Sequence, residues 1–85
     1  MTYKSKNYLV VSAEGSELYE AVRDSKGMYL GTLIKDLPSG VTVTSMEPKQ
    51  SFRLNQLGPK VKAIKVKYLD QFEGWVRFDC LQEQD

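Results

Sequence analysis

The stretch that decides the expected fold is Glu73-Gly74-Trp75-Val76-Arg77-Phe78-Asp79-Cys80-Leu81, which holds the only tryptophan of the chain. Side chains alternate along a β-strand, so Trp75 and Arg77 would point to one side and Val76 and Phe78 to the other. We expect this to be the last strand of a small barrel, which it would close. Trp75 then has two interpretations: it covers one end of the core, or it contacts a ligand.

The other strand candidates are short apolar or alternating runs that glycine, proline, serine and aspartate separate. They are Tyr8–Val11, Leu18–Arg23, Met28–Ile34, Val41–Met46 and Ala63–Leu69. No stretch of useful length has helical periodicity. The sequence therefore predicts an all-β chain of about five short strands, folded as a single small barrel.

Residues 47–60 break this regularity, because their apolar positions follow no period. A connection of about a dozen residues is uncommon in so small a domain and often carries function. Its apolar residues Phe52, Leu54 and Leu57 are open to two interpretations. They form one short helical turn that closes an open end of the core, or they are exposed.

Composition excludes several functions. The chain has 85 residues, enough for one domain, and a net charge of +1. It contains one cysteine and no histidine, so a disulfide within the chain is impossible and both the commonest zinc ligand and the commonest general base are missing. We therefore expect no enzymatic activity and no cofactor.

The expected organisation is a flexible N-terminal segment over residues 1–7, a barrel over residues 8–81 and a polar tail over residues 82–85. No apolar run is long enough for a signal peptide or a membrane helix. The sequence therefore favours a cytoplasmic location, unless the chain is a fragment of a longer secreted protein.

Three segments resemble bacterial SH3-like (SH3b) domains. They are Leu30-Gly31-Thr32-Leu33, Pro38-Ser39-Gly40-Val41-Thr42-Val43 and the closing Gly74-Trp75-Val76 run that ends at Leu81. The resemblance implies a five-stranded SH3-like barrel and, for some members, binding to the cell wall. Two segments depart from the family pattern: residues 20–27 replace its usual Asn-Val-Arg-Ser-Gly-Pro loop, and residues 47–60 are longer than usual.

Protein or peptide binding is the function that the sequence favours. Aromatic residues near the first long loop and in the last strand accompany acidic residues, as in grooves that bind proline-rich peptides with a basic residue. We expect a non-catalytic interaction module, a small subunit or an inhibitor, of bacterial or phage origin. The candidate binding residues are Tyr19, Tyr29, Phe52, Arg53, Lys65, Lys67 and Trp75.

Two alternatives stay open at this point. A peptidoglycan-binding SH3b module is the first, and single-stranded nucleic-acid binding is the second. The latter depends on exposed tyrosines that could stack on bases and on a run of basic residues. These are Arg53, Lys60, Lys62, Lys65 and Lys67.

Overall fold

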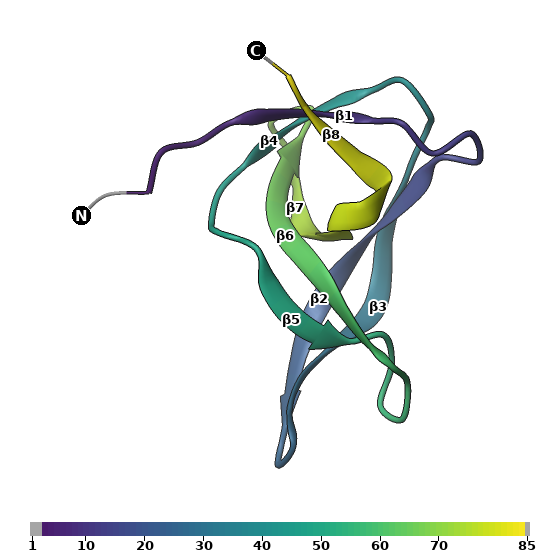
Figure 1. Ribbon diagram of the computed structural model, residues 1–85, viewed down its shortest axis with the longest axis vertical. Coiled ribbons are helices and arrows are strands. Elements are labelled where there is room, and N and C mark those ends of the chain that lie inside the picture. The colour runs from purple at the N-terminus through teal and green to yellow at the C-terminus, as the bar shows by residue number, and fades with distance from the viewer. Residues whose placement is uncertain (1–2, 85) are drawn as a thin grey trace.

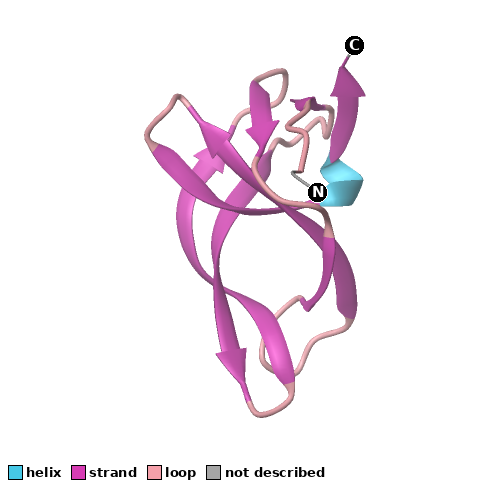
Figure 2. Ribbon diagram, turned by 90° about the vertical axis from the view of Figure 1, so that its left-hand side faces the viewer, coloured by secondary structure: helices cyan, strands magenta, loops and turns pink. Residues whose placement is uncertain are grey.

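The computed structural model describes residues 3–84 and consists almost entirely of β-strands (Figure 1). The strands are β1 (Asn7–Val10), β2 (Ser16–Asp24), β3 (Gly27–Leu37), β4 (Thr42–Ser45), β5 (Gln50–Arg53), β6 (Lys60–Tyr68), β7 (Phe72–Arg77) and β8 (Leu81–Gln84). A single turn of 3₁₀-helix, η1 (Phe78–Cys80), separates β7 from β8 (Figure 2). The prediction of an all-β fold is confirmed.

Five of the strands close into a ring. Their order is β5, β3, β2, β7 and β6, and β5 also pairs with β6. Two seams of the ring are narrow: β3 and β5 meet in parallel only at Tyr29 and Arg53, and β2 and β7 meet only at Tyr19 and Trp75. The predicted small domain with a closed arrangement of five strands is thus present, and Trp75 lies at one of its closures.

The remaining strands extend from β6, which pairs on both of its edges. One edge pairs with β7, and the other pairs first with β5 and then with β4. Strand β1 lies beside β4, and β8 lies beside β1. Residues 82–84, expected as a polar tail, therefore belong to a strand that pairs with β1.

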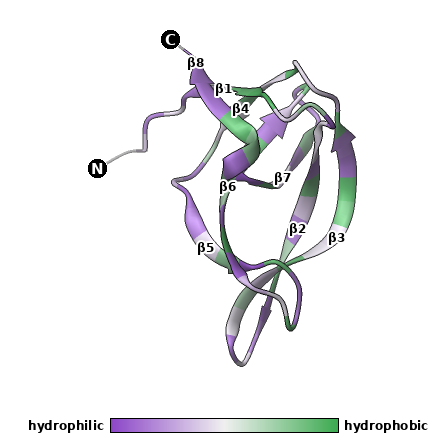
Figure 3. Ribbon diagram, turned by 45° about the vertical axis from the view of Figure 1, so that its right-hand side comes forward, coloured by the Kyte–Doolittle hydropathy of each residue, from purple (hydrophilic) through white to green (hydrophobic). Residues whose placement is uncertain are grey.

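Apolar residues pack on both faces of the β6–β7 hairpin. Successive side chains of each strand point to opposite faces, and each face carries buried apolar residues from both strands. The larger core cluster contains Tyr8, Val10, Leu18, Leu37, Val43, Ile64, Val66 and Val76. The smaller cluster, inside the ring, contains Leu30, Phe52, Ala63 and Trp75. Trp75 and Val76 therefore point to opposite faces, as the alternation predicted. Figure 3 shows hydrophobic and hydrophilic residues in separate bands along β3.

Two details of the predicted strands are wrong. Residues 47–60 are not an irregular connection with a helical turn, because β5 forms within them and pairs with β6 from Gln50 to Arg53. The last strand ends at Arg77 instead of Leu81, because the chain turns through η1 before it runs beside β1. Local periodicity does not report strand pairing: β5 pairs with the next strand, β6, and β8 pairs with β1 at the other end of the chain.

Within residues 3–84 the structure contains no helix of the length and apolarity that crossing a membrane requires.

Candidate functional site: the hairpin-tip surface

Trp75 and Phe52 lie in the core of the ring. Trp75 is 6% exposed and Phe52 is 1% exposed, and their ring centroids are 4.6 Å apart with an interplanar angle of 50°. Trp75 also lies opposite Lys65 on β6 and opposite Tyr19 on β2. This burial fits the interpretation that Trp75 covers the core, and it leaves little indole surface for a ligand.

The two lysines expected to give β6 a basic outer face both have acidic partners. The ammonium group of Lys65 lies 3.4 Å from a carboxylate oxygen of Glu47, and that of Lys67 lies 3.8 Å from one of Glu73. These pairs are partly exposed, so each contributes little to stability. The two acidic partners nevertheless neutralise Lys65 and Lys67. This face of β6 therefore lacks the net positive charge that binding to a nucleic-acid backbone requires.

Tyr19 is partly buried beside the same seam, and its hydroxyl donates a hydrogen bond of 2.6 Å to Oε1 of Glu17. Burial and this hydrogen bond raise the pKa of Tyr19 to about 12. The phenol therefore stays protonated over the physiological pH range, and Glu17 already occupies its donor group.

The remaining candidates, Tyr29 and Arg53, lie where two turns meet. The β2–β3 turn and the β5–β6 turn project from the same end of the molecule (Figure 1). We define the hairpin-tip surface as residues 24–28 of the first turn and residues 53–60 of the second.

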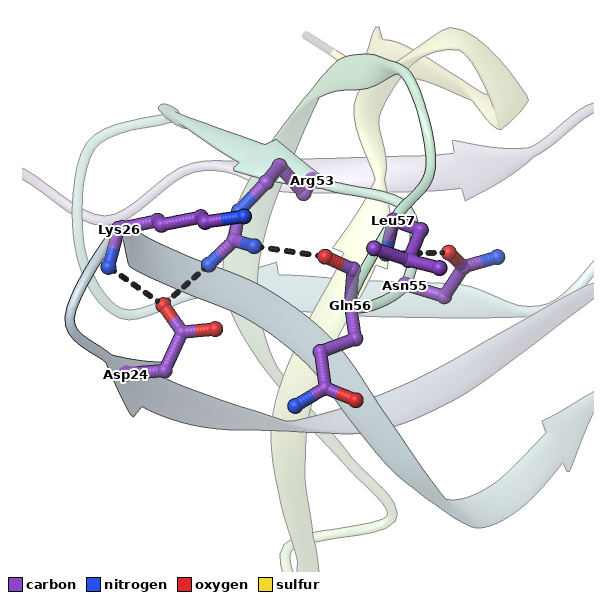
Figure 4. A network of polar contacts seen from close by, with 6 residues as sticks. All are labelled: Asp24, Lys26, Arg53, Asn55, Gln56 and Leu57. Carbon is purple, nitrogen blue, oxygen red and sulfur yellow. Dashed lines mark hydrogen bonds and ion pairs between the residues drawn. The ribbon is translucent and has the colours of Figure 1, made fainter.

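Arg53 joins the two turns (Figure 4). Its Nη2 donates a hydrogen bond of 2.5 Å to Oδ1 of Asp24, and its Nη1 donates one of 2.8 Å to the carbonyl oxygen of Gln56. Its guanidinium group lies over the ring of Tyr29, 5.4 Å from the centroid. The Arg53 side chain is only 12% exposed and that of Asp24 is 25% exposed. A pair so well shielded from water fixes one turn against the other more firmly than a surface ion pair would.

The β5–β6 turn is held by its own hydrogen bonds. The N–H of Leu54 donates to the carbonyl of Pro59 at 2.8 Å, and the N–H of Gly58 donates to the carbonyl of Asn55 at 3.2 Å. The side-chain oxygen of Asn55 accepts a third bond, 3.0 Å long, from the N–H of Leu57 (Figure 4). Leu57 lies in this turn and is 89% exposed.

The hairpin-tip surface also carries several basic side chains. Lys26, Arg53 and Lys60 line a small cleft of about 140 Å³ together with Met28 and Phe52. Nη2 of Arg23 lies 3.8 Å from the sulfur of Met28, one of the residues that line the cleft. Residues 24–28 and 53–60 contain three basic residues and one acidic residue, Asp24, which is bound to Arg53, so the surface is positively charged.

The pH dependence of folding stability should reveal the contact between Asp24 and Arg53 that links the two turns. Hydrogen bonds from Arg53 and from the backbone N–H of Lys26 hold the pKa of Asp24 below its ordinary value. A carboxyl group with a lowered pKa in the folded state adds stability above its unfolded pKa, about 4, and loses that contribution as the pH falls through the folded value. We expect the denaturant midpoint of the wild type to fall more steeply below about pH 4 than that of Asp24→Asn. Equal slopes would contradict this role of Asp24.

Comparisons with protein-family models, with curated proteins and with solved structures found no match to this chain. The resemblance to SH3b domains therefore stays a prediction. In the part of the chain that the structure describes, no group of three acidic, cysteine or histidine side chains is arranged to hold a metal ion.

Sequence reasoning missed three members of the hairpin-tip surface. In the sequence Asp24 and Lys26 belong to a predicted turn, Asp24 is also one of the acidic residues that favour peptide binding, and Leu57 has two interpretations, burial and exposure. A signal for Leu57 existed, because Asn55 and Gly58 flank it as turn-forming residues. The pairing of the two turns through Arg53 has no local signal, since 29 positions separate it from Asp24.

Proposed function

We propose that this protein is a non-catalytic interaction module that binds another protein through the hairpin-tip surface. Leu57 would enter an apolar pocket of the partner, and the basic residues around it would face acidic residues there. The observation that carries the proposal is the exposure of Leu57 in a turn fixed by hydrogen bonds and by the Arg53–Asp24 pair.

Exposure of a single leucine is common and explains nothing by itself. Leu57 differs because the turn already holds it in place. Binding therefore costs little further ordering of this segment, which favours affinity. Burial of one leucine side chain stabilises a complex by about 1.5–3 kcal/mol, which corresponds to roughly a 10- to 150-fold change in affinity.

The charge around Leu57 specifies the partner. Lys26, Arg53 and Lys60 line one cleft, and Asp24, the one acidic residue among residues 24–28 and 53–60, is bound to Arg53. Complementary charges mainly steer association and exclude wrong partners. We therefore expect an acidic protein surface with one apolar pocket, bound more weakly as salt is added.

The test is affinity capture from lysate of the source cell, with and without nuclease treatment, in which wild type, Leu57→Asp and Leu69→Asp are compared side by side. Leu69 is a matched control, because it is also an exposed leucine, 65% exposed, in the turn at the other end of β6. Aspartate tolerates the left-handed backbone of Leu69, whose φ is 56°.

We expect Leu57→Asp to lose the captured protein at least about tenfold and Leu69→Asp to retain it. The captured protein should be acidic, and raised salt should release it. Equal capture by both variants would overturn the proposal. Retention of only nucleic acid or cell-wall fragments would overturn it as well and would favour one of the two alternative functions.

A further inference from the structure

One edge of strand β2 is only partly covered by the rest of the sheet. The first edge of β2 pairs with β3 from Ser16 to Asp24, whereas the second edge meets β7 only at Tyr19 and Trp75. No further strand among residues 3–84 pairs with β2. Residues 20–24 therefore have no strand on their outer side, and we call this segment the β2 edge.

The register of the β2–β3 hairpin shows which backbone groups the β2 edge leaves free. Asp24 and Gly27 are partners on either side of a two-residue turn, so they form a hydrogen-bonded pair. Bonded and non-bonded pairs alternate along an antiparallel ladder, so Val22 also bonds to β3. The N–H and C=O groups of Ala21 and Arg23 therefore point away from β3. No backbone hydrogen bond of a turn or loop in the described part of the chain uses them.

The β2 edge begins at a cleft, where β2 and β7 diverge. The cleft measures about 400 Å³ and is lined by Glu20, Ala21, Ile34, Lys65, Glu73, Gly74 and Trp75. Open space therefore separates Ala21 from β7 at this point.

The β2 edge lacks the usual protection against pairing with another chain. Exposed edges of natural sheets are commonly blocked by proline or by charges that repel a neighbouring strand. Residues 20–24 contain no proline, and they carry charges of both signs. Glu20 and Arg23 are exposed, and neither has an ion-pair partner among residues 3–84. Such an edge can pair with a second copy without repulsion.

We propose that the protein forms a two-fold symmetric dimer in which the β2 edges of two copies pair in antiparallel orientation. This inference goes beyond the proposed function, because the partner is a second copy of the chain. Addition of a strand to an open sheet edge is a common mode of recognition, and two-fold symmetry makes one surface serve both copies.

One register uses the free backbone groups of both residues in both copies. Ala21 of each copy lies opposite Arg23 of the other, each of these pairs exchanges two hydrogen bonds, and Val22 lies opposite Val22. A register shifted by one pair of residues places Arg23 opposite Tyr19, whose edge β7 already covers. The opposite shift places Ala21 opposite Ser25, which belongs to the turn.

The charges support this register. Arg23 of one copy lies opposite Ala21 of the other, and Ala21 lines the cleft together with Glu20 and Glu73. The carboxylate of Glu73 lies 3.8 Å from the ammonium group of Lys67, so Glu20 supplies the uncompensated negative charge. Two-fold symmetry repeats the contact. Each copy therefore contributes one arginine to the other copy's cleft.

The β2 edge lies apart from Leu57. Strand β5 pairs with β3 at Tyr29 and Arg53, so the β5–β6 turn adjoins the opposite side of the hairpin from the β2 edge. The dimer therefore leaves Leu57 exposed.

Disulfide trapping tests the register. Val22→Cys in a Cys80→Ser background places two thiols at a non-hydrogen-bonded pair, where Cα atoms lie about 4.5 Å apart, and disulfides span roughly 4.4–6.8 Å. Oxidised glutathione is the oxidant and is reduced to two molecules of glutathione as the disulfide forms. Glu20→Cys in the same background is the matched control, because four residues of strand separate its copies by about 13 Å. We expect Val22→Cys to form the covalent dimer at least about tenfold faster than Glu20→Cys.

Sedimentation velocity at concentrations up to about 1 mM measures the dimer without a covalent link. We expect a weak dimer, because the interface is small, and we expect added salt to weaken it further. Ala21→Pro removes an N–H that no strand of the chain uses, so the fold should persist while the dimer weakens at least about tenfold. Arg23→Glu should weaken the dimer severalfold, and Leu57→Asp should leave it unchanged.

Three outcomes would overturn the proposal. They are a monomer at every concentration, equal trapping of Val22→Cys and Glu20→Cys, and a dimer that a folded Ala21→Pro variant leaves intact. If circular dichroism shows that Ala21→Pro is unfolded, the trapping result decides. These measurements do not involve Leu57, so the dimer and the proposed protein interface can fail separately.

Discussion

Replacement of Trp75 by alanine should cost about 3–5 kcal/mol of folding free energy. The indole is 6% exposed and packs against Phe52 within the ring, so its removal leaves a cavity that β-strands on all sides can fill only in part. The stability of a domain of 85 residues is roughly 4–13 kcal/mol. Trp75→Ala should therefore bring the protein close to its unfolding threshold.

Chemical denaturation followed by far-UV circular dichroism would measure this loss without relying on tryptophan fluorescence. If Trp75→Ala does not fold at all, Phe52→Leu gives a milder test of the same contact. A double-mutant cycle between Trp75→Phe and Phe52→Leu should show a coupling of about 0.5–1.5 kcal/mol. A cost below about 1 kcal/mol for Trp75→Ala would mean that the tryptophan does not hold the ring together.

Replacement of Gly74 by alanine should also destabilise the fold, by about 1–3 kcal/mol. A β-carbon at this position would lie 2.8 Å from the carbonyl oxygen of Tyr19, 2.9 Å from Cδ1 of Ile34 and 3.0 Å from Cγ of Leu18. The carbonyl belongs to the backbone of β2 and cannot rotate away. The substitution therefore pushes apart β2 and β7, which pair only at Tyr19 and Trp75.

A second substitution separates the two main clashes. Ile34→Val removes Cδ1 and leaves the carbonyl of Tyr19 in place. We expect Gly74→Ala to stay destabilising in the Ile34→Val background, because the backbone contact remains. Full recovery of the denaturant midpoint, relative to Ile34→Val alone, would show that the side-chain contact was the whole effect.

The face that β6 presents to the larger core cluster could be predicted from sequence. Ile64 and Val66 alternate with Lys65 and Lys67, and the structure buries the first two while it leaves the lysines partly exposed. Successive side chains point to opposite faces of a strand, so this information is local. Strand pairing leaves no mark in local periodicity, which is why β5, paired with the next strand, and β8, paired with β1, were missed as strands.

Some residues of the candidate site could be predicted from sequence, and others depend on tertiary structure. Arg53 and Tyr29 could be chosen because charged and aromatic residues often bind ligands, and the structure joins them in one contact. Asn55 and Gly58 indicate the turn around Leu57, but the exposure of Leu57 depends on where the end of β5 and the start of β6 place that turn. The neutralisation of Lys65 by Glu47 also depends on tertiary structure, since the two residues lie on separate segments.

The measurement that tests the central claim most directly is site-specific photo-crosslinking with a photoreactive residue at position 57 or at position 69. Both positions hold exposed leucines in hairpin turns, at opposite ends of β6. We expect position 57 to form a covalent adduct with the captured acidic protein and position 69 to form none. Equal adducts from both positions, or no adduct from position 57 while the protein is still captured, would contradict docking through the hairpin-tip surface.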